Sequence, residues 1–447
     1  MSECPLRHII KRDGDIAAYD RDRITTAIFN AAAAVGGSER ATAQALAAIV
    51  ERTLVHTCGT EAMPTVEDIQ DIVEETLVRE GHAKTARQYI RYRHERALAR
   101  EAREDLVEIH DNIPYKKIYD ALRWNMSHHC DTVEGLNDLI TRGQYGDLVR
   151  ACEERYVTEV RAGAERILER MPGVRIAIIA GPSSSGKTTT TIKIIERLKE
   201  EGVQLKSLSV DHYFFSLDMH PKDEFGDYDY ETPEALDLAL INRHLAELLE
   251  GRIVKTPHYD FKSGRRTLDA HELRLEENEI LLIDSLHGLY GDMTRSVPSP
   301  RIFRLYVETL GQMRGARGEF MRWADNRLMR RMIRDSWHRN LQPLETLAHW
   351  HYVRASELKH IIPFIKHVDY VVNSAMPFEL PILKHRLFRF FPMGMERYRE
   401  DPKRQDAYIR AKRVHHFLAP ILEMADDGAL SRTSLIREFI GGSAYAY

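Results

Sequence analysis

Residues 181–188 read GPSSSGKT and fit the pattern G-x-x-x-x-G-K-[ST] without a gap. An apolar segment, residues 175–180, precedes this stretch, and residues 187–200 follow it with a pattern typical of a helix. A strand, a glycine-rich turn and a helix in this order form a loop whose backbone N–H groups can surround phosphate oxygens. The stretch therefore predicts a phosphate-binding loop (P-loop) and, with it, an α/β fold.

The residue types of this loop predict how ATP and Mg²⁺ would be held. The glycines let the backbone approach phosphate closely, Lys187 reaches the β- and γ-phosphate oxygens, and the Thr188 hydroxyl is a Mg²⁺ ligand. We predict that ATP is bound by Gly181, Ser183, Ser184, Ser185, Gly186, Lys187, Thr188 and Thr189. Most proteins with such a loop hydrolyse ATP or GTP to drive motion or switching, so acids further along the chain must identify the reaction.

Two apolar segments further along end in an aspartate. Residues 204–210 lead into Asp211, and residues 279–284 end in Asp284. If the first segment is the strand next to the P-loop strand, Asp211 faces the γ-phosphate and can take a proton from an acceptor hydroxyl. The alternative is an aspartate that only caps a turn. Asp284 fits a carboxylate that supports Mg²⁺, so the predicted metal residues are Thr188, Asp211 and Asp284.

Residues 325–339 carry a helical face made of arginines. These side chains follow one another at the spacing i, i+3, i+4, i+7, and they are Arg327, Arg330, Arg331 and Arg334. The acids nearest to them in sequence are Asp325 and Asp335, so the face would repel itself unless it met an anion. We predict a lid that contacts the transferring phosphate; a solvated face is the alternative.

The order of the apolar segments predicts the fold class and the domains. Short β-rich runs at 175–180, 204–210, 279–284, 302–307 and 368–373 alternate with helical stretches. This alternation predicts an α/β domain with a mainly parallel sheet flanked by helices. The expected domains are residues 1–97, mostly helical; 98–172, a helical connector; 173–395, the P-loop domain; and 396–447, a helical tail.

Composition excludes several classes of protein. The 447 residues are 43% hydrophobic and 30% charged, with a net charge of -4 and no apolar run of about 18 residues that could cross a membrane. The four cysteines form no C-x-x-C pair. We therefore expect a cytoplasmic protein with no membrane segment, no disulfide framework and no general attraction to nucleic acid.

The N-terminal region predicts a second nucleotide site. Lys11 and Arg12 stand on a turn closed by Gly14, where they can hold phosphates, and Ile10 and Ile24 can flank a purine. The pattern continues with Arg23, then with a helix capped by Thr65 and Asp68, and then with residues 86–93. Together these stretches resemble the ATP-cone, a regulatory domain of ribonucleotide reductases. The resemblance implies ATP or dATP as effector, bound by Ile10, Lys11, Arg12 and Arg23.

Six stretches of the P-loop region resemble the uridine kinase and phosphoribulokinase group of P-loop kinases. They are GPSSSGKT, VDHYF (210–214), GDYDYETPEALD (226–237), PHYDF (257–261), LLIDSLHGLY (281–290) and RLMRRMIRD (327–335). The resemblance implies that Asp211 is the base and that Lys187, Arg327, Arg330 and Arg334 act on the phosphates. It places the acceptor along Asp211, Tyr213, Glu231, Tyr259 and Arg330.

The predicted function is ATP-dependent phosphorylation of a small hydroxyl-bearing metabolite, most of all a nucleoside, regulated through the ATP-cone. Two alternatives remain open: a kinase for another alcohol, such as a sugar phosphate or pantothenate, and a non-catalytic nucleotide sensor. Asp211 distinguishes the last, because a sensor needs no base beside the γ-phosphate. A homo-oligomer is expected.

Overall fold

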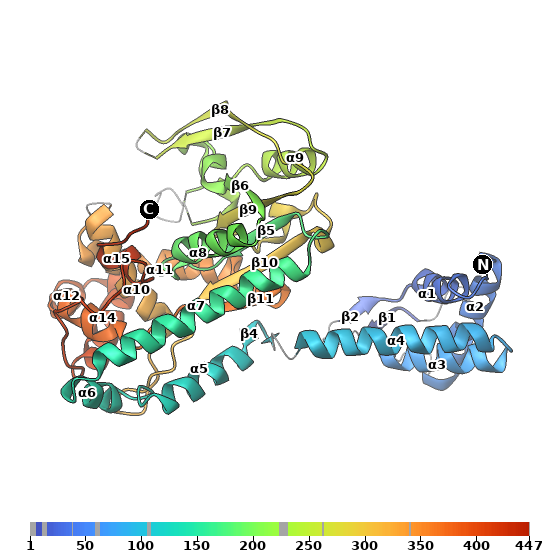
Figure 1. Ribbon diagram of the computed structural model, residues 1–447, viewed down its shortest axis with the longest axis horizontal. Coiled ribbons are helices and arrows are strands. Elements are labelled where there is room, and N and C mark those ends of the chain that lie inside the picture. Colours follow the sequence, from blue (N-terminus) through green and yellow to red (C-terminus); the bar gives the residue numbers. More distant parts are fainter. Residues whose placement is uncertain are drawn as a thin grey trace. The chain divides into compact units, whose positions relative to one another are not determined.

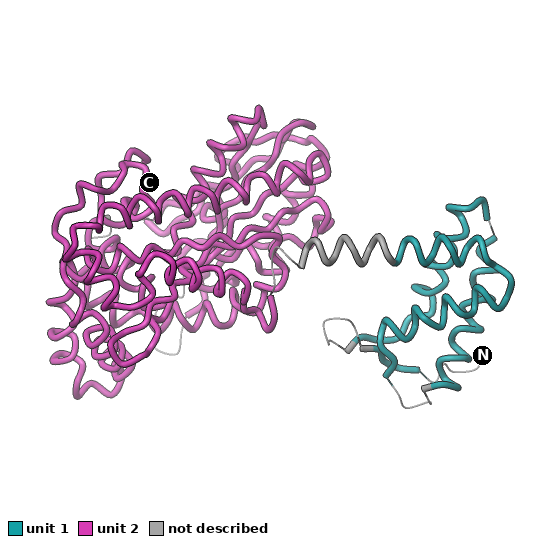
Figure 2. The backbone as a smooth tube through the Cα atoms, turned by 60° about the horizontal axis from the view of Figure 1, so that its bottom comes forward, with its two compact units in different colours: residues 1–105 teal, residues 106–447 magenta. Residues whose placement is uncertain are grey.

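The computed structural model describes residues 6–10, 16–37, 39–58, 63–104, 109–222, 231–261, 263–338 and 341–446. The chain divides into two compact units, residues 1–105 and residues 106–447 (Figure 2). The larger unit contains the P-loop together with residues 106–172, which the sequence predicts as a helical connector.

The larger unit is built on a five-stranded parallel sheet. Its strands are β5 (Ile176–Ala180), β6 (Gln204–Ser209), β9 (Glu279–Ser285), β10 (Ile302–Glu308) and β11 (Tyr370–Asn373). Each of the five predicted strands is present, with ends shifted by at most two residues. Both faces of β5 are buried, which explains its continuous apolar sequence.

The strand order corrects one expectation from the sequence. The order is β11-β10-β5-β9-β6, so β6 pairs with β9 and not with the P-loop strand β5. The prediction that the strand before Asp211 is the direct neighbour of the P-loop strand was wrong. Strand β9, which contains Asp284 next to its last residue, lies between them, and Asp211 comes two residues after the carboxyl end of β6. Both aspartates therefore stand at the same edge of the parallel sheet.

Alternate residues of β5 pack into two cores. Ala177 and Ile179 belong to one core with α7 (Tyr145–Glu169) and α8 (Lys187–Glu200). Ile176 and Ile178 belong to the other, with α9 (Leu238–Leu249). The sheet is thus covered by helices on both faces, as the sequence predicts.

The connector region packs directly against the sheet. It forms β3 (Ile109–His110), β4 (Ile113–Pro114), α5 (Tyr115–Ser127), α6 (Val133–Thr141) and α7. Gly163 permits the close approach of α7, since a Cβ atom there would lie 2.9 Å from Leu305 Cδ1 on β10.

Further elements flank the sheet. An antiparallel hairpin, β7 (Val254–Asp260) and β8 (Arg265–Leu273), lies with α9 beyond the β6 edge (Figure 1). The short turn η1 (Val210–Tyr213) follows β6. The remaining helices are α10 (Trp323–His338), α11 (Pro343–His360), α12 (Glu379–Leu387), α13 (Phe390–Tyr398), α14 (Gln405–Leu418) and α15 (Arg437–Ile440).

The smaller unit is mainly helical. It comprises β1 (His8–Ile10), β2 (Ile16–Ala18), α1 (Arg21–Ala33), α2 (Arg40–Cys58), α3 (Val66–Arg79) and α4 (Ala83–Glu104). The predicted cap is confirmed, because Thr65 and Asp68 form a reciprocal capping box at the start of α3. Lys11 and Arg12 lie outside the described residues, as does the side chain of Ile10. Arg23 is exposed and lies 3.6 Å from Asp20.

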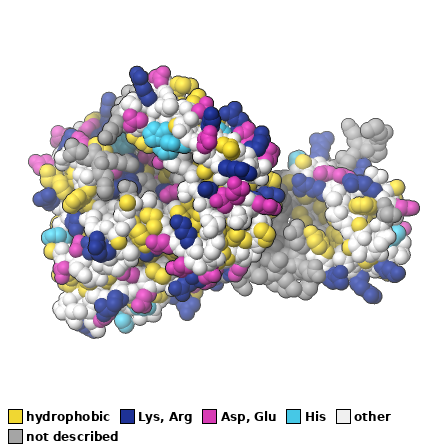
Figure 3. Space-filling view, turned by 45° about the horizontal axis from the view of Figure 1, so that its top comes forward, with side chains coloured by type: hydrophobic (Ala, Val, Ile, Leu, Met, Phe, Trp, Pro, Cys, Tyr) yellow, Lys and Arg dark blue, Asp and Glu magenta, His cyan; other side chains and the backbone are white. Residues whose placement is uncertain are grey.

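The surface mixes charges of both signs. On the face shown in Figure 3, basic and acidic side chains alternate over the larger unit. Within the described ranges, none of the helices combines the length and apolar character that a membrane crossing requires.

Candidate active site

The P-loop closes tightly around the N-terminus of α8, and glycine is required at two of its positions. A Cβ atom at Gly181 would lie 2.3 Å from the carbonyl oxygen of Val307 on the neighbouring strand. Gly186 has φ +89°, and a Cβ atom there would lie 2.6 Å from Leu435 Cδ1. Side chains at either position would force the loop open, so the loop pattern has a direct steric cause.

Lys187, Asp284 and Asp211 form the charged centre of the site. Lys187 Nζ donates to the carbonyl oxygen of Pro182 at 3.2 Å. Burial lowers the pKa of Lys187, while Asp284 and Asp211 act on it in the opposite direction. Burial raises the pKa of Asp284 to about 6; the positive charge of Lys187 opposes this shift and Asp211 adds to it. The three predicted residues therefore interact electrostatically at one edge of the sheet.

The oxygen donors of this edge fit a Mg²⁺ ion shared with a nucleotide. Thr188 presents an exposed hydroxyl, Asp211 is exposed, and Asp284 is half-buried. No set of three or more His, Cys, Asp or Glu side chains in the described part of the chain could hold a metal ion by itself. Mg²⁺ is commonly held by one or two carboxylates together with substrate phosphates, which is the donor set that these residues offer.

Arg327 on α10 is completely buried and faces carboxylates. Its guanidinium binds Glu357 at 2.5 and 2.9 Å and lies 2.8 Å from Glu308. It also donates to the carbonyl oxygen of Ser183 in the P-loop at 3.0 Å. Arg327 therefore stabilises the P-loop backbone through this hydrogen bond.

Arg330 is held in the same way one turn later. It binds both carboxylate oxygens of Glu379 and donates to the carbonyl oxygens of Ser374 and Ser185. The premise that the arginine face has only Asp325 and Asp335 as counter-charges was wrong, because carboxylates from other elements reach it. Neither Arg327 nor Arg330 needs a phosphate for neutralisation.

The other two arginines of the face, Arg331 and Arg334, have different partners. Arg331 donates through Nη1 to Ser183 Oγ at 3.0 Å and to Glu231 Oε1 at 3.1 Å. Arg334 is more exposed and acts electrostatically on Lys187, whose pKa it helps to lower. Arg331 stands on the predicted face but outside the predicted set of catalytic side chains, and the structure makes it the link between the P-loop and the acceptor side.

The predicted acceptor residues have different surroundings. Glu231 accepts a hydrogen bond from Arg331, which holds its carboxylate near the P-loop. Tyr259 is 2% exposed and lies in an aromatic cluster with Phe214 and Phe261. Tyr213 has no exposed surface, and its hydroxyl is hydrogen-bonded to His244 Nδ1 at 2.9 Å. It is therefore part of the core and presents no surface to a substrate.

Three histidines gather beside Asp211, a grouping that the sequence analysis missed. The rings of His212 and His258 are 4.6 Å apart, and those of His258 and His271 are 5.8 Å apart. Burial lowers the pKa of His212, as does the nearby His258, whereas Asp211 raises it. The hairpin thus brings imidazoles from three separate segments to the acceptor side.

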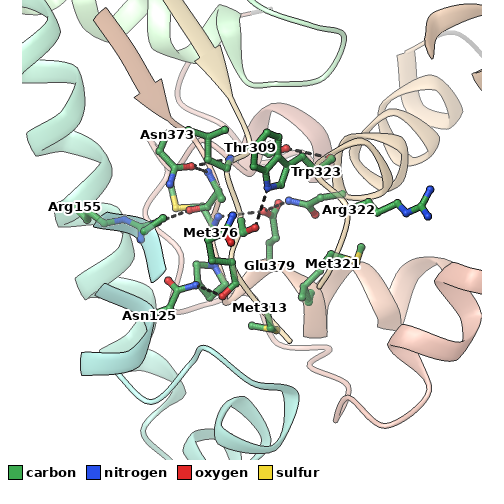
Figure 4. A pocket seen from close by; sticks show the side chains of 18 residues that line it. Asn125, Arg155, Thr309, Met313, Met321, Arg322, Trp323, Asn373, Met376 and Glu379 are labelled. Atoms are coloured by element: carbon green, nitrogen blue, oxygen red, sulfur yellow. Dashed lines mark hydrogen bonds between the residues drawn. The ribbon is translucent and has the colours of Figure 1, made fainter. Parts of the chain in front are cut away.

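A small cavity with a mainly apolar lining lies away from this centre (Figure 4). It has a volume of about 30 Å³, and Arg155, Thr309, Trp323 and Asn373 line it with other residues. Among the described residues, no hydrogen-bond partner is found for Asn125 Oδ1 or for Arg155 Nε and Nη1, which border this cavity. Its size and these unpartnered polar atoms suit an ordered water molecule.

Comparisons with known proteins match a part of each unit to a family model. Residues 176–379 match the model of the phosphoribulokinase / uridine kinase family, and residues 7–98 match the ATP cone domain. Both resemblances predicted from sequence are confirmed.

Individual relatives share part of the chain. A uridine kinase from Deinococcus deserti is 27% identical over 195 residues, which are 43% of this chain and 84% of that protein. A uridine kinase from Schizosaccharomyces pombe is 34% identical over 132 residues, which are 29% of this chain and 28% of that protein. A solved structure described as a possible uridine kinase from Bacillus stearothermophilus covers 48% of this chain and 98% of its own, with 14% identity and a TM-score of 0.34.

The family match and these relatives support an ATP-dependent kinase domain in the larger unit, with ATP as phosphate donor.

Proposed function

We propose that the chain transfers the γ-phosphoryl group of ATP to a hydroxyl of a small metabolite, and that this metabolite is a nucleoside. The observation that carries the proposal is the placement of Asp284 and Asp211 at the carboxyl ends of the adjacent strands β9 and β6, beside the P-loop strand β5. There the charges of both carboxylates act on Lys187. A nucleotide switch or sensor needs the lysine and the metal-supporting acid, but a second acid beside them is suited to removing a proton.

Each residue has a defined task in this reaction. Asp211 accepts the proton of the acceptor hydroxyl, whose oxygen then forms a bond to the γ-phosphorus. The bond from phosphorus to the bridging oxygen breaks, and Lys187 stabilises the charge that develops on the leaving ADP. Mg²⁺, when bound through Thr188, Asp284 and Asp211, would neutralise charge on the phosphates.

The arginines of α10 support this transfer in two ways. Arg327 and Arg330 hold the P-loop carbonyl groups of Ser183 and Ser185, which fixes the shape of the loop. Arg334, which acts on Lys187, is the member of the face best suited to contact the transferring phosphate. Preorganised cations of this kind account for much of the catalysis of phosphoryl transfer.

The acceptor side has features that suit a nucleoside. Glu231 offers a carboxylate, fixed by Arg331, that can accept hydrogen bonds from ribose hydroxyls. In the cluster of Phe214, Tyr259 and Phe261, Phe261 is 60% exposed and offers aromatic surface for a base, while the other two rings are buried and pack against it. The relatives named uridine kinase point to the same class of acceptor.

We further propose that the smaller unit regulates the kinase by binding ATP or dATP. The support is the match of residues 7–98 to the ATP cone domain, and the residues proposed for the effector are Ile10, Lys11, Arg12 and Arg23. An effector of this kind must change an equilibrium of the protein, either acceptor affinity or the size of a homo-oligomer.

A panel of acceptors tests the proposed reaction. ADP release is measured with MgATP and, in turn, uridine, cytidine, adenosine, a pentose phosphate and pantothenate. We expect release that depends on a nucleoside and exceeds the ATPase rate measured without acceptor. ADP release stimulated by a pentose phosphate or pantothenate, and not by a nucleoside, would show that the acceptor belongs to that other class. Binding of ATP without stimulated ADP release would favour a nucleotide sensor.

A further inference from the structure

The first turn of helix α8, which begins in the P-loop, binds a carboxylate of the protein itself, that of Glu438. Glu438 Oε2 accepts hydrogen bonds from the backbone N–H of Thr189 at 3.2 Å and from its hydroxyl at 2.7 Å. Glu438 lies on α15, 249 residues further along the chain, and is 5% exposed. Both donors of Thr189 predicted to bind the nucleotide are therefore occupied by a carboxylate.

The segment that delivers Glu438 is fixed by apolar packing. The side chains of Leu435, Ile436, Phe439 and Ile440 are buried in the core that α7 and α8 share. Leu435 lies against Gly186 of the P-loop.

Polar and aromatic contacts hold the segment in place as well. Phe439 lies 5.2 Å from the Arg330 guanidinium. Arg437 and Arg386 both bind Asp427, at 3.1 and 3.3 Å, which ties α15 to α12. The backbone of α15 is thus anchored, and the Glu438 carboxylate at its surface accepts its hydrogen bonds from Thr189.

The carboxylate also belongs to the electrostatic environment of the reaction centre. Glu438 stabilises the charged form of Lys187 and, together with Asp211, helps to raise the pKa of Asp284. A triphosphate placed on the P-loop would meet the same negative charge at short range. Free N–H groups at a helix N-terminus attract phosphate, so a carboxylate bound there competes with it.

We propose that Glu438 is an internal competitor of the nucleotide: its carboxylate binds Thr189 in the ligand-free protein and must turn away before a nucleotide phosphate can take that place. Because the apolar side chains of α15 are buried, the side chain rotates while the segment stays docked. Glu438 therefore weakens nucleotide affinity and couples the C-terminal segment to the occupancy of the P-loop. The inference rests on the proposed nucleotide site.

Calorimetry with ADP and with MgATP tests this competition on the full chain. Glu438→Gln keeps the shape of the side chain and removes its charge. We expect its dissociation constant for both nucleotides to fall about tenfold, since a hydrogen bond to a charged group has been removed from the competing state. The matched control is Glu196→Gln. Glu196 lies on α8, the helix that Glu438 contacts, and it accepts a hydrogen bond from the hydroxyl of Tyr445 in the C-terminal segment at 3.0 Å. The dissociation constants of this variant should equal those of the wild type.

Unchanged or weaker nucleotide binding by Glu438→Gln would overturn the inference and make Glu438 a structural support of the P-loop. If that variant does not fold, Glu438→Asp carries the test, because it keeps the charge and is one methylene too short to bind Thr189 in the same way. Tighter binding by Glu438→Asp supports competition, and unchanged or weaker binding refutes it. Failure of the wild type to bind either nucleotide would refute the proposed nucleotide site itself, which is a separate result.

Discussion

The guanidinium of Arg330 binds both carboxylate oxygens of Glu379, at 2.7 and 2.9 Å, and neither side chain has any exposed surface. The same guanidinium donates to the carbonyl oxygens of Ser374, the residue after β11, and of Ser185 in the P-loop. One buried ion pair thus connects α10, α12, the sheet and the phosphate-binding loop.

Breaking this pair should destabilise the larger unit. Glu379→Gln leaves the Arg330 charge buried without its counter-charge, and removing one partner of a buried pair typically costs about 3–5 kcal/mol. Urea unfolding at pH 7.5 measures the loss. Glu423→Gln is the matched control: it makes the same substitution at an exposed site that pairs with His385, and its effect should stay within about 0.5 kcal/mol. Equal stability of the two variants would show that the buried pair contributes little.

Replacing the P-loop lysine should abolish phosphoryl transfer. Lys187→Ala removes the charge proposed to stabilise the β- and γ-phosphates, and we expect kcat to fall by roughly 10³ or more. Lys199→Ala removes an exposed charge from the same helix and should leave kcat unchanged. The comparison is made by ADP release at saturating MgATP and acceptor. Near-normal turnover of Lys187→Ala would remove the kinase assignment.

The sequence predicts the strands of the sheet well because each is a short apolar run between turn or helix signals. It does not specify which strands are neighbours, since a repeated strand-helix pattern is compatible with several orders. That is why β6 was expected beside β5, although β9 separates them.

The P-loop and the acids that follow the strands were predictable for a related reason, since their positions are set by local sequence and by the ends of strands. The partners of the arginine face were not predictable in this way. Glu357 and Glu379 are 30 and 49 residues from the arginines that they bind, and Glu438 is 249 residues from Thr189. Helical spacing reports neighbours within one or two turns and gives no information on such contacts.

Removing the charge of Asp284 should stabilise the ligand-free protein at neutral pH. The folded state raises the pKa of Asp284 from 3.8 to about 6, so this residue favours folding below pH 3.8 and loses that contribution as the pH rises through 6. The free energy of unfolding of Asp284→Asn should therefore exceed that of the wild type at pH 8, by about 3 kcal/mol at most, and the variant should melt at a higher temperature. The advantage should shrink at pH 4.5.

Thermal melts without nucleotide or Mg²⁺ at the two pH values measure this difference. Asp218→Asn, at an exposed position after η1, serves as control and should melt like the wild type at both. An Asp284→Asn variant that is less stable than the wild type at pH 8 would mean that the charged carboxylate is held favourably in the folded protein.

The ATP cone domain should give the chain a second adenine nucleotide site. Calorimetry of the full chain should find two sites per chain, and the double variant Lys11→Ala, Arg12→Ala should retain one. The double variant Arg52→Ala, Lys84→Ala removes two exposed charges from helices of the same unit and should retain two sites.

If the cone regulates the kinase, dATP and ATP should also differ in the size of the oligomer by light scattering or in kinase rate. The coupling expected for such an effect is roughly 1–3 kcal/mol. A single site in the wild type, with mass and rate indifferent to dATP, would contradict the regulatory proposal.

The central claim is that Asp211 is the base of a phosphoryl transfer, and the kcat of Asp211→Asn with the best acceptor of the panel tests it most directly. We predict that kcat falls about 10²- to 10⁴-fold, because the acceptor hydroxyl has lost the group that takes its proton, while ATP affinity measured by calorimetry stays near that of the wild type. An intact kcat, or a large loss of ATP affinity with kcat preserved, would contradict the role of Asp211 as base and leave it only a metal-binding or structural role.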